Sequence, residues 1–319
     1  MRVQPNEHGA LQALQSVLLS IDSVRNARAW YLLLLGFTAA GLLITGVMQA
    51  LGRDADVTAA LLAGAAFFCL FYSSNAAGLV LMDEACGREI RFPREALGDA
   101  LRCAHRLLAV VICVLVATAA LGALVTALLW ACRLPVVGTA LLGVLVPVAV
   151  PALGLAVVAL LALVGPVAAP AVWDGLGVRA VLALLIRQAR VRFAQALMLS
   201  AAVSLISALV AGLVSFVVLA GGRALLGLAF WGAGIELAGQ PFLAALFGQS
   251  LRVAPGAPAL SALNQAAHTG AGVVFALGLV VPAVVYLRGL CELYLALRRS
   301  DGHDPADPAH TSRPAETPP

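Results

Sequence analysis

Ionisable side chains are few in the apolar part of this sequence, and two sets of residues stand out. Glu292 follows Arg288 by four positions, the spacing at which opposite charges meet on a helix. Glu236 is an isolated acid within the apolar stretch "RALLGLAFWGAGIELAGQPFLAALFGQSLR". Ionisable residues inside a membrane segment are candidates for function because burying their charge is costly. We therefore expect an Arg288–Glu292 ion pair near a helix end, and Glu236 either in an outer loop or lining a site.

Arginines form the other set, and their chemistry suits phosphate-bearing partners. On a helix, the charged residues of "REALGDALRCAHRLL" fill an arc of roughly 140°, opposite an apolar side. The arginines of "VRAVLALLIRQAR" fall within about 80° of one another. Helices with one basic and one apolar face lie in the headgroup plane of a membrane. The residues expected to contact anionic headgroups or a protein partner are Arg94, Arg102, Arg106, Arg179, Arg187 and Arg190.

Motifs of soluble enzymes are missing from the sequence. It contains no GxSxG, HExxH, P-loop or paired-carboxylate motif. Its six cysteines form no CxxC pair, so free thiols are expected rather than a disulfide framework. We expect no catalytic residue, no cofactor and no metal site.

The composition indicates the environment that surrounds most of the chain. Hydrophobic residues make up 62% of the 319 residues and charged residues 11%, against about 45–50% and about 25% in soluble domains. Such a surplus of apolar side chains requires a bilayer. Lysine is absent, which indicates a GC-rich, bacterial genome. The net charge of +4 does not suggest nucleic acid as a partner.

Six uncharged runs are long enough to cross a membrane, which takes about 20 apolar residues each. They lack the alternating pattern of barrel strands, so the predicted fold is an all-α, polytopic helical bundle with six transmembrane helices. Prolines in the fourth run predict a kinked helix with an irregular exit at Pro166 and Pro170. The runs are 29–52, 57–82, 107–132, 134–173, 193–222 and 253–287.

The arginines predict the orientation. Six crossings place sixteen arginines on one side and four on the other. Because positive residues accumulate in cytoplasmic loops, both termini are expected in the cytoplasm of a bacterial inner membrane.

Residues 223–252 are ambiguous, because they are apolar enough for a seventh crossing. Glu236, Pro241 and five internal glycines weaken such a helix. We expect an outer interfacial or re-entrant region over 223–264, anchored by Trp231 and Phe242. The Pro-rich tail 300–319 is expected to be disordered.

The amphipathic stretches recur before pairs of apolar runs. A third, weaker one is "LQALQSVLLSIDSVRNARAW", near the N-terminus. The membrane domain 1–299 is therefore predicted to contain three repeats of an interfacial amphipathic helix followed by a helix pair, over about 10–85, 92–170 and 176–298.

Three stretches carry a resemblance to known proteins. They are Pro170, Asp174, Gly175 and Gly177 before "RAVLALLIRQARVRF"; the loop "MDEACGREIRFPREALGDALRCAHRLL"; and "LYLALRRSDG" with Tyr294 and Arg298. Over roughly 10–302 the chain resembles the membrane domain attached to some bacterial glycerophosphodiester phosphodiesterases, and related uncharacterised families. The catalytic barrel of those enzymes is not in this sequence, so the resemblance does not imply their activity. It implies a six-helix membrane module of unknown biochemical role. Gln188 stands where those families commonly have Ser.

The first functional hypothesis is a non-enzymatic integral membrane protein: a scaffold, accessory or regulatory module with a basic cytoplasmic face. Its partners would be membrane lipids, including anionic headgroups, or a membrane protein. The alternative is a transporter or flippase-like protein for a lipid or small amphiphile. An intramembrane enzyme is a third possibility. Polar residues around a central cavity would favour transport, and a solid apolar core would favour the scaffold.

Overall fold

The structure is a computed structural model, and it describes residues 26–133, 137–234, 239–247 and 262–299. Every regular element in these ranges is a helix, as the composition predicts. The elements are α2 (Ala27–Leu51), α3 (Asp56–Ala85), α4 (Pro93–Ala131), α5 (Val137–Ala159), a π-helical turn η2 (Leu160–Val164), α6 (Gly165–Trp173), α7 (Val178–Val191), α8 (Phe193–Ala233), α9 (Gly239–Ala245) and α10 (Ala262–Arg299).

Six segments of the described chain are long and apolar enough to cross a membrane. They correspond to the six uncharged runs, and the fold class of a polytopic all-α membrane protein is confirmed. The segments are Ala27–Leu51, Asp56–Ala85, Pro93–Ala131, Leu141–Trp173, Phe193–Ala233 and Thr269–Arg299.

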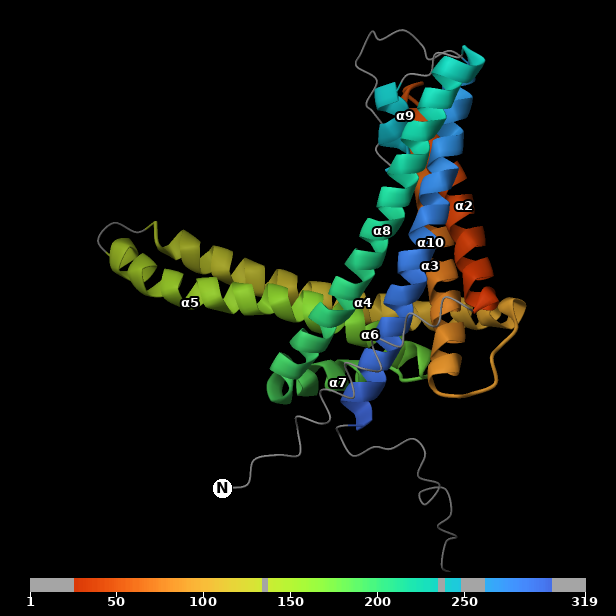
Figure 1. Cartoon of the computed structure of the whole chain (residues 1–319). Helices are drawn as coiled ribbons and strands as arrows, with labels where there is room; N and C mark the ends of the chain where they lie inside the picture. The colour runs from red at the N-terminus through yellow and green to blue at the C-terminus, as the bar shows by residue number, and fades with distance from the viewer. Residues whose placement is uncertain (1–25, 134–136, 235–238, 248–261, 300–319) are drawn as a thin grey trace, which may run out of the picture.

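Four of the long helices, α2, α3, α8 and α10, stand side by side as an upright bundle (Figure 1). Small residues bring α2 and α3 together: a Cβ on Gly36 would lie 1.9 Å from Oγ of Ser73. Gly36 therefore allows α2 and α3 to approach closely at this point. We call the end of the bundle where α3 and α10 finish the charged end, and the opposite end, where α2 finishes, the far end.

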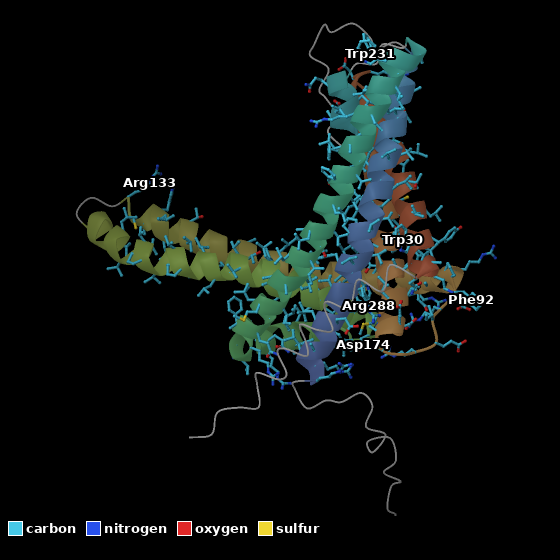
Figure 2. All side chains as sticks on the ribbon, in the orientation of Figure 1. Trp30, Phe92, Arg133, Asp174, Trp231 and Arg288 are labelled. Atoms are coloured by element: carbon cyan, nitrogen blue, oxygen red, sulfur yellow. The ribbon has the colours of Figure 1, made fainter. Side chains whose placement is uncertain are left out.

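The α4–α5 hairpin leaves this bundle sideways. Figure 1 shows α4 running across the bundle near its charged end and α5 returning alongside it, both steeply inclined to the four upright helices. Arg133 marks the tip of this arm (Figure 2). The six long apolar helices are therefore not all parallel to one another in this structure.

The interfacial helix expected over 94–108 is not a separate element. It is the first part of α4, which continues without a break to Ala131. Nothing in the sequence between the two parts interrupts a helix, since they share Leu, Ala and Val residues without Pro. By contrast α7 is a separate amphipathic helix, divided from α8 at Arg192. The stretch before α2 lies largely outside the described residues, so a threefold repeat stays a prediction.

The proline-rich exit of the fourth apolar run is helical, and the expected irregular exit is wrong. The chain passes from α5 through η2 into α6 and ends only at Trp173. Pro166 has no N–H to donate and crowds the preceding turn. The wider turn at η2, immediately before it, accommodates this defect without ending the helix.

The region expected to be interfacial or re-entrant, 223–264, extends the bundle in its described parts. Residues 223–233 are the last three turns of α8, so α8 continues through Arg223 instead of ending before it. Phe242 on α9 is 6% exposed and packs with Leu246 and Ala271, so its predicted role as a membrane anchor is wrong. Trp231 is 87% exposed, as an anchor requires. Glu236 and the tail 300–319 lie outside the described residues.

Candidate functional site

Most of the described ion pairs lie at the charged end, and Asp174 joins three of the segments there. Its carboxylate is 4% exposed and lies 2.6 Å from the guanidinium of Arg88. The other carboxylate oxygen pairs with Arg298 and accepts a 3.0 Å hydrogen bond from the Tyr294 hydroxyl. One acid from the end of α6 thus binds the loop after α3 and the last two turns of α10.

Two helix ends of the same type place Asp174 and Arg88. At the end of α6, the N–H groups of Gly175 and Leu176 donate to the carbonyls of Val172 and Ala171. At the end of α3, Gly87 and Arg88 donate to Glu84 and Asp83 in the same pattern. Both are Schellman motifs, which need a residue with positive φ after the cap. Gly175 and Gly87 supply it, with φ of 100° and 65°.

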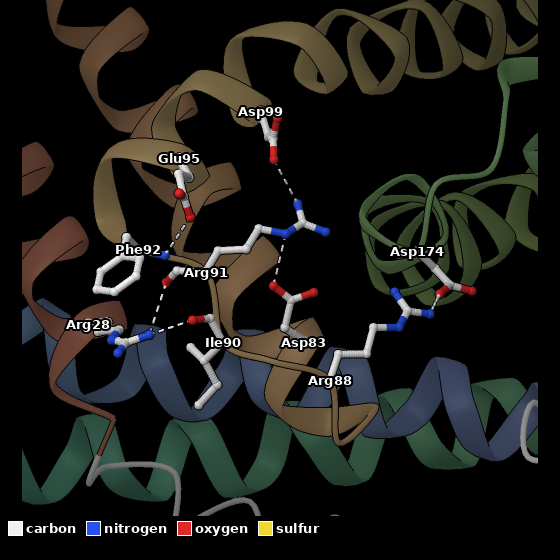
Figure 3. Close-up of polar contacts among 9 residues, drawn as sticks. All are labelled: Arg28, Asp83, Arg88, Ile90, Arg91, Phe92, Glu95, Asp99 and Asp174. Atoms are coloured by element: carbon white, nitrogen blue, oxygen red, sulfur yellow. Dashed lines mark hydrogen bonds and ion pairs between the residues drawn. The ribbon is translucent and has the colours of Figure 1, made fainter.

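A second acid, Asp83, lies in the last turn of α3, with its side chain 3% exposed. Nε of Arg91 lies 3.0 Å from it as an ion pair, and Nη1 of the same arginine lies 3.3 Å from Asp99 on α4. Figure 3 shows Arg91 between the two carboxylates. The loop between α3 and α4 is therefore fixed to both helices by one guanidinium group.

The α3–α4 loop is also held by α2. Arg28 donates to the carbonyls of Ile90 and Arg91, and its guanidinium carbon lies 4.9 Å from the centre of the Phe92 ring. Helix α4 starts directly afterwards, where the Glu95 carboxylate accepts a 3.2 Å hydrogen bond from the Phe92 N–H. Pro93 at the first helical position suits this start. The direction of α4 is thus set by contacts on both sides of its first residue.

The Arg288–Glu292 pair expected from the sequence is formed, with 2.7 Å between nitrogen and oxygen. Both side chains are largely buried, 14% and 12% exposed, and Arg288 also donates to the Leu81 carbonyl at 3.2 Å. Glu84 lies 4.0 Å from Arg288 and accepts a hydrogen bond from Asn26 before α2. This pair therefore joins α10 to α3 and to the start of α2, rather than extending into water.

The electrostatics of the charged end follow from these contacts. The hydrogen bond from Arg88 to Asp174 raises the pKa of the Arg88 guanidinium. Burial raises the pKa of the neighbouring Cys86 thiol, although Arg88 opposes this shift. Each buried acid has an arginine partner, so the cluster holds its charges in fixed pairs. Such an arrangement fastens helices together.

All six arginines predicted to contact headgroups lie on the surface of α4 and α7. Arg94, Arg102 and Arg106 are exposed on the first half of α4. On α7, Val181 and Leu185 are buried while Arg179, Arg187 and Arg190 are exposed, which gives this helix its expected two faces.

Asp174, Asp83 and Arg88 were not singled out from the sequence as site residues. The positions of the two acids in the sequence could have indicated them, because Asp83 and Asp174 each directly follow an apolar run of 26 or more residues. The structure also brings together Asp174, the α3–α4 loop, and Tyr294 with Arg298. These come from the three stretches that carry the resemblance described above.

Within the described residues, no group of three or more His, Cys, Asp or Glu side chains could hold a metal ion. All six cysteines are free. Comparison of the chain with protein-family models, curated proteins and solved structures finds no match.

Proposed function

We propose that this protein is a non-enzymatic integral membrane protein, a scaffold, accessory or regulatory module that binds anionic lipid headgroups at its charged end. The observation that carries the proposal is a division among its arginines. Arg88, Arg91, Arg288 and Arg298 are paired with acids of the same chain. Those on the outer sides of α4 and α7 are exposed.

Five of these exposed arginines are available to an external anion. In the described part of the chain, no ion pair involves Arg94, Arg102, Arg106, Arg179 or Arg190. A guanidinium group binds phosphate with two parallel hydrogen bonds. Each arginine near an anionic membrane surface contributes about 1 kcal/mol. The positive-inside rule supports a cytoplasmic location for this face and for both termini in a bacterial inner membrane.

The cavities between the upright helices support a scaffold more than a transporter. One cavity of about 50 Å³ lies between α8, α9 and α10, lined mainly by apolar side chains with Ser215. Another, of about 10 Å³, lies between α2 and α10 beside Thr38 and Thr45. Sites for small ligands are typically about 300–1,000 Å³. A lipid or amphiphile pathway would need these helices to separate.

The relation to the membrane domains of glycerophosphodiester phosphodiesterases is likewise a proposal. The meeting of the three stretches at the charged end supports it, because these stretches would then share one structural task.

The proposal is tested by removing charge in matched pairs. Arg179 and Arg190 on α7 are replaced by Gln in one variant, and Arg53 and Arg223 at the far end in another. Both variants lose two exposed positive charges. Lipids that co-purify in native nanodiscs are then quantified. Enrichment of anionic lipid should fall in the first variant only, and high salt should have a similar effect on the parent protein. Equal lipid profiles in parent and first variant would refute headgroup binding.

A further inference from the structure

We infer that α4 and α5 do not cross the membrane: they lie flat in the leaflet at the charged end and contact the acyl chains of that leaflet. The crossing helices would then be α2, α3, α8 and α10. The inference goes beyond the proposed function, because it requires only that charged side chains stay out of hydrocarbon, whatever lipid they meet.

The continuity of α4 is the first argument. Its first half carries exposed Arg94, Arg102 and Arg106, and charged side chains at the centre of a bilayer are costly. This half must therefore lie near the headgroups. Because α4 continues without a break from Pro93 to Ala131, its apolar second half continues in the same direction. A crossing would need a sharp bend after Arg106, but α4 is uninterrupted there and has no proline after Pro93 that would cause one.

The direction of the arm relative to the bundle is the second argument. If the four upright helices cross the membrane, the steeply inclined α4–α5 hairpin runs along it (Figure 1). Helix α7 also runs across the bundle axis at the charged end, with its buried face against α4 and α6. Its arginines are exposed. An in-plane amphipathic helix over the base of the hairpin marks the headgroup layer there.

The surface of the arm fits acyl chains. Between Arg106 and Arg133 the sequence has no charge, and neither has 134–173. Large apolar side chains are exposed on both helices, among them Val116 (62%), Leu124 (58%), Val144 (67%) and Leu155 (60%). Water around this surface would be strongly unfavourable at about 25 cal/mol per Å². Contact with lipid chains removes that cost.

The dimensions agree with a single leaflet. A helix with its side chains is about 10–12 Å thick. Half of the hydrocarbon core is about 15 Å, so a hairpin lying flat fits within one leaflet. Arg133 at the tip, close to the 71% exposed Trp130, can extend its guanidinium to the headgroups of that leaflet. Placing Arg133 on the charged side changes the arginine split to seventeen against three, which strengthens the positive-inside bias.

The side of the membrane reached by the arm's tip provides the first test. In the full chain, Cys132 is kept as the reporter, while Cys69, Cys86, Cys103 and Cys113 are replaced by Ala. Cys291 is kept because it is completely buried. An impermeant maleimide is added to sealed vesicles of known orientation. Two matched variants carry their reporter elsewhere: one retains Cys86 at the charged end, and one has Arg53→Cys at the far end, each with Cys132→Ala.

The two topologies predict opposite labelling. If the hairpin lies in one leaflet, the maleimide labels Cys132 from the same side of the membrane as Cys86. A pair of crossings labels it from the side that labels Arg53→Cys, and this result would overturn the inference.

A depth measurement decides the case independently, including when Cys132 is shielded in sealed vesicles. Nitroxide labels are placed at the exposed positions Leu108, Leu115 and Leu124 along α4, and their accessibility to oxygen and to a polar nickel chelate is compared. For a flat hairpin the three depths should agree to within about one helix diameter, about 10 Å. For a crossing helix they should pass from one surface through the centre, about 15 Å deep. Labels at Leu205 and Leu213 on α8 supply the crossing profile, and the same profile on α4 would refute the flat hairpin.

Discussion

The indole N–H of Trp173 donates a 3.0 Å hydrogen bond to the side-chain oxygen of Asn75, which joins the end of α6 to α3. The Asn75 amide in turn donates to the Phe71 carbonyl at 2.8 Å. Trp173 and Asn75 are both buried, at 4% and 3% exposure. This polar contact within an apolar core sets the height of α6 against α3, and hence where Asp174 meets its partners.

Removing either partner of this hydrogen bond should destabilise the fold, and the effects of removing both should not be additive. In a double-mutant cycle with Asn75→Ala and Trp173→Phe, we expect a coupling free energy of about 1 kcal/mol, since hydrogen bonds between membrane helices are of that order. Unfolding by SDS titration in mixed micelles measures it. Strictly additive effects of the two substitutions would show that the bond contributes nothing.

Gly78 is where the Trp173 ring rests on α3. A Cβ at this position would lie 2.3 Å from Cζ2 of the ring, so Gly78→Ala should displace α6 and cost about 1–3 kcal/mol, as overpacking does. Gly64 lies in the same helix with open space beside it, and Gly64→Ala serves as the matched control. Thermal unfolding in detergent should separate the two variants, and equal midpoints would contradict this packing.

The buried acid Asp174 should matter more than the exposed acid of the same cluster. Asp174→Ala leaves Arg88, Arg298 and Tyr294 without their shared partner, and we expect a loss of about 2 kcal/mol because the two arginines are partly exposed and rehydrate. Asp99→Ala removes one 3.3 Å contact from a carboxylate with 45% exposure and should cost at most about 0.5 kcal/mol.

These two variants should also differ in proteolysis near the end of α10. Cleavage after Arg298 or Arg299 should speed up in Asp174→Ala only. Equal cleavage in both variants would argue against Asp174 as the fastening point.

Cys86 should react with maleimide at higher pH in the folded protein than in the unfolded one. Burial disfavours the thiolate and raises its pKa above the ordinary value of 9.0, and the thiolate is the reactive form. At any pH near neutrality the folded thiol is therefore less ionised. The measurement is the pH at half-maximal alkylation rate in a variant whose reporter is Cys86, before and after unfolding in SDS.

Removal of Arg88 supplies the control for this titration. The Arg88 charge favours the thiolate, so Arg88→Gln should move the midpoint of alkylation further upward. A folded midpoint at or below that of the unfolded chain would contradict the assigned cause.

The apolar helices could be predicted from the sequence because charge marks their limits. Residues 29–52, for example, carry no charge, and α2 spans Ala27–Leu51. No comparable feature of the sequence indicates the direction of a helix relative to its neighbours. The first half of α4 has the pattern of an interfacial helix and the second that of a crossing helix, yet one uninterrupted helix contains both. The direction of α4 relative to the bundle depends on the contacts of Arg28 with the α3–α4 loop and of Arg91 with α3 and α4, which arise only in the folded chain.

The charged end shows a similar division. The Arg288–Glu292 pair was predictable because four positions of a helix bring the two residues together. The partners of Asp174 are 86 and 124 residues away, and no local pattern encodes such distances. Phe242 was misassigned for the same reason, because a single aromatic residue near an interface has the same sequence signature whether it anchors in lipid or packs against Leu246.

Because the chain is synthesised from its N-terminus, the contacts of Asp174 can form only in a fixed order. Arg88 leaves the ribosome before Asp174, so that pair can form as soon as α6 is inserted. Arg298 and Tyr294 come from the end of α10, which is made after all the other described helices. A nascent chain that has not yet made α10 therefore holds Asp174 with one of its two arginine partners, and only the arrival of α10 supplies Arg298 and Tyr294. The arrival of α10 is thereby recorded in the folded state, at the carboxylate of Asp174.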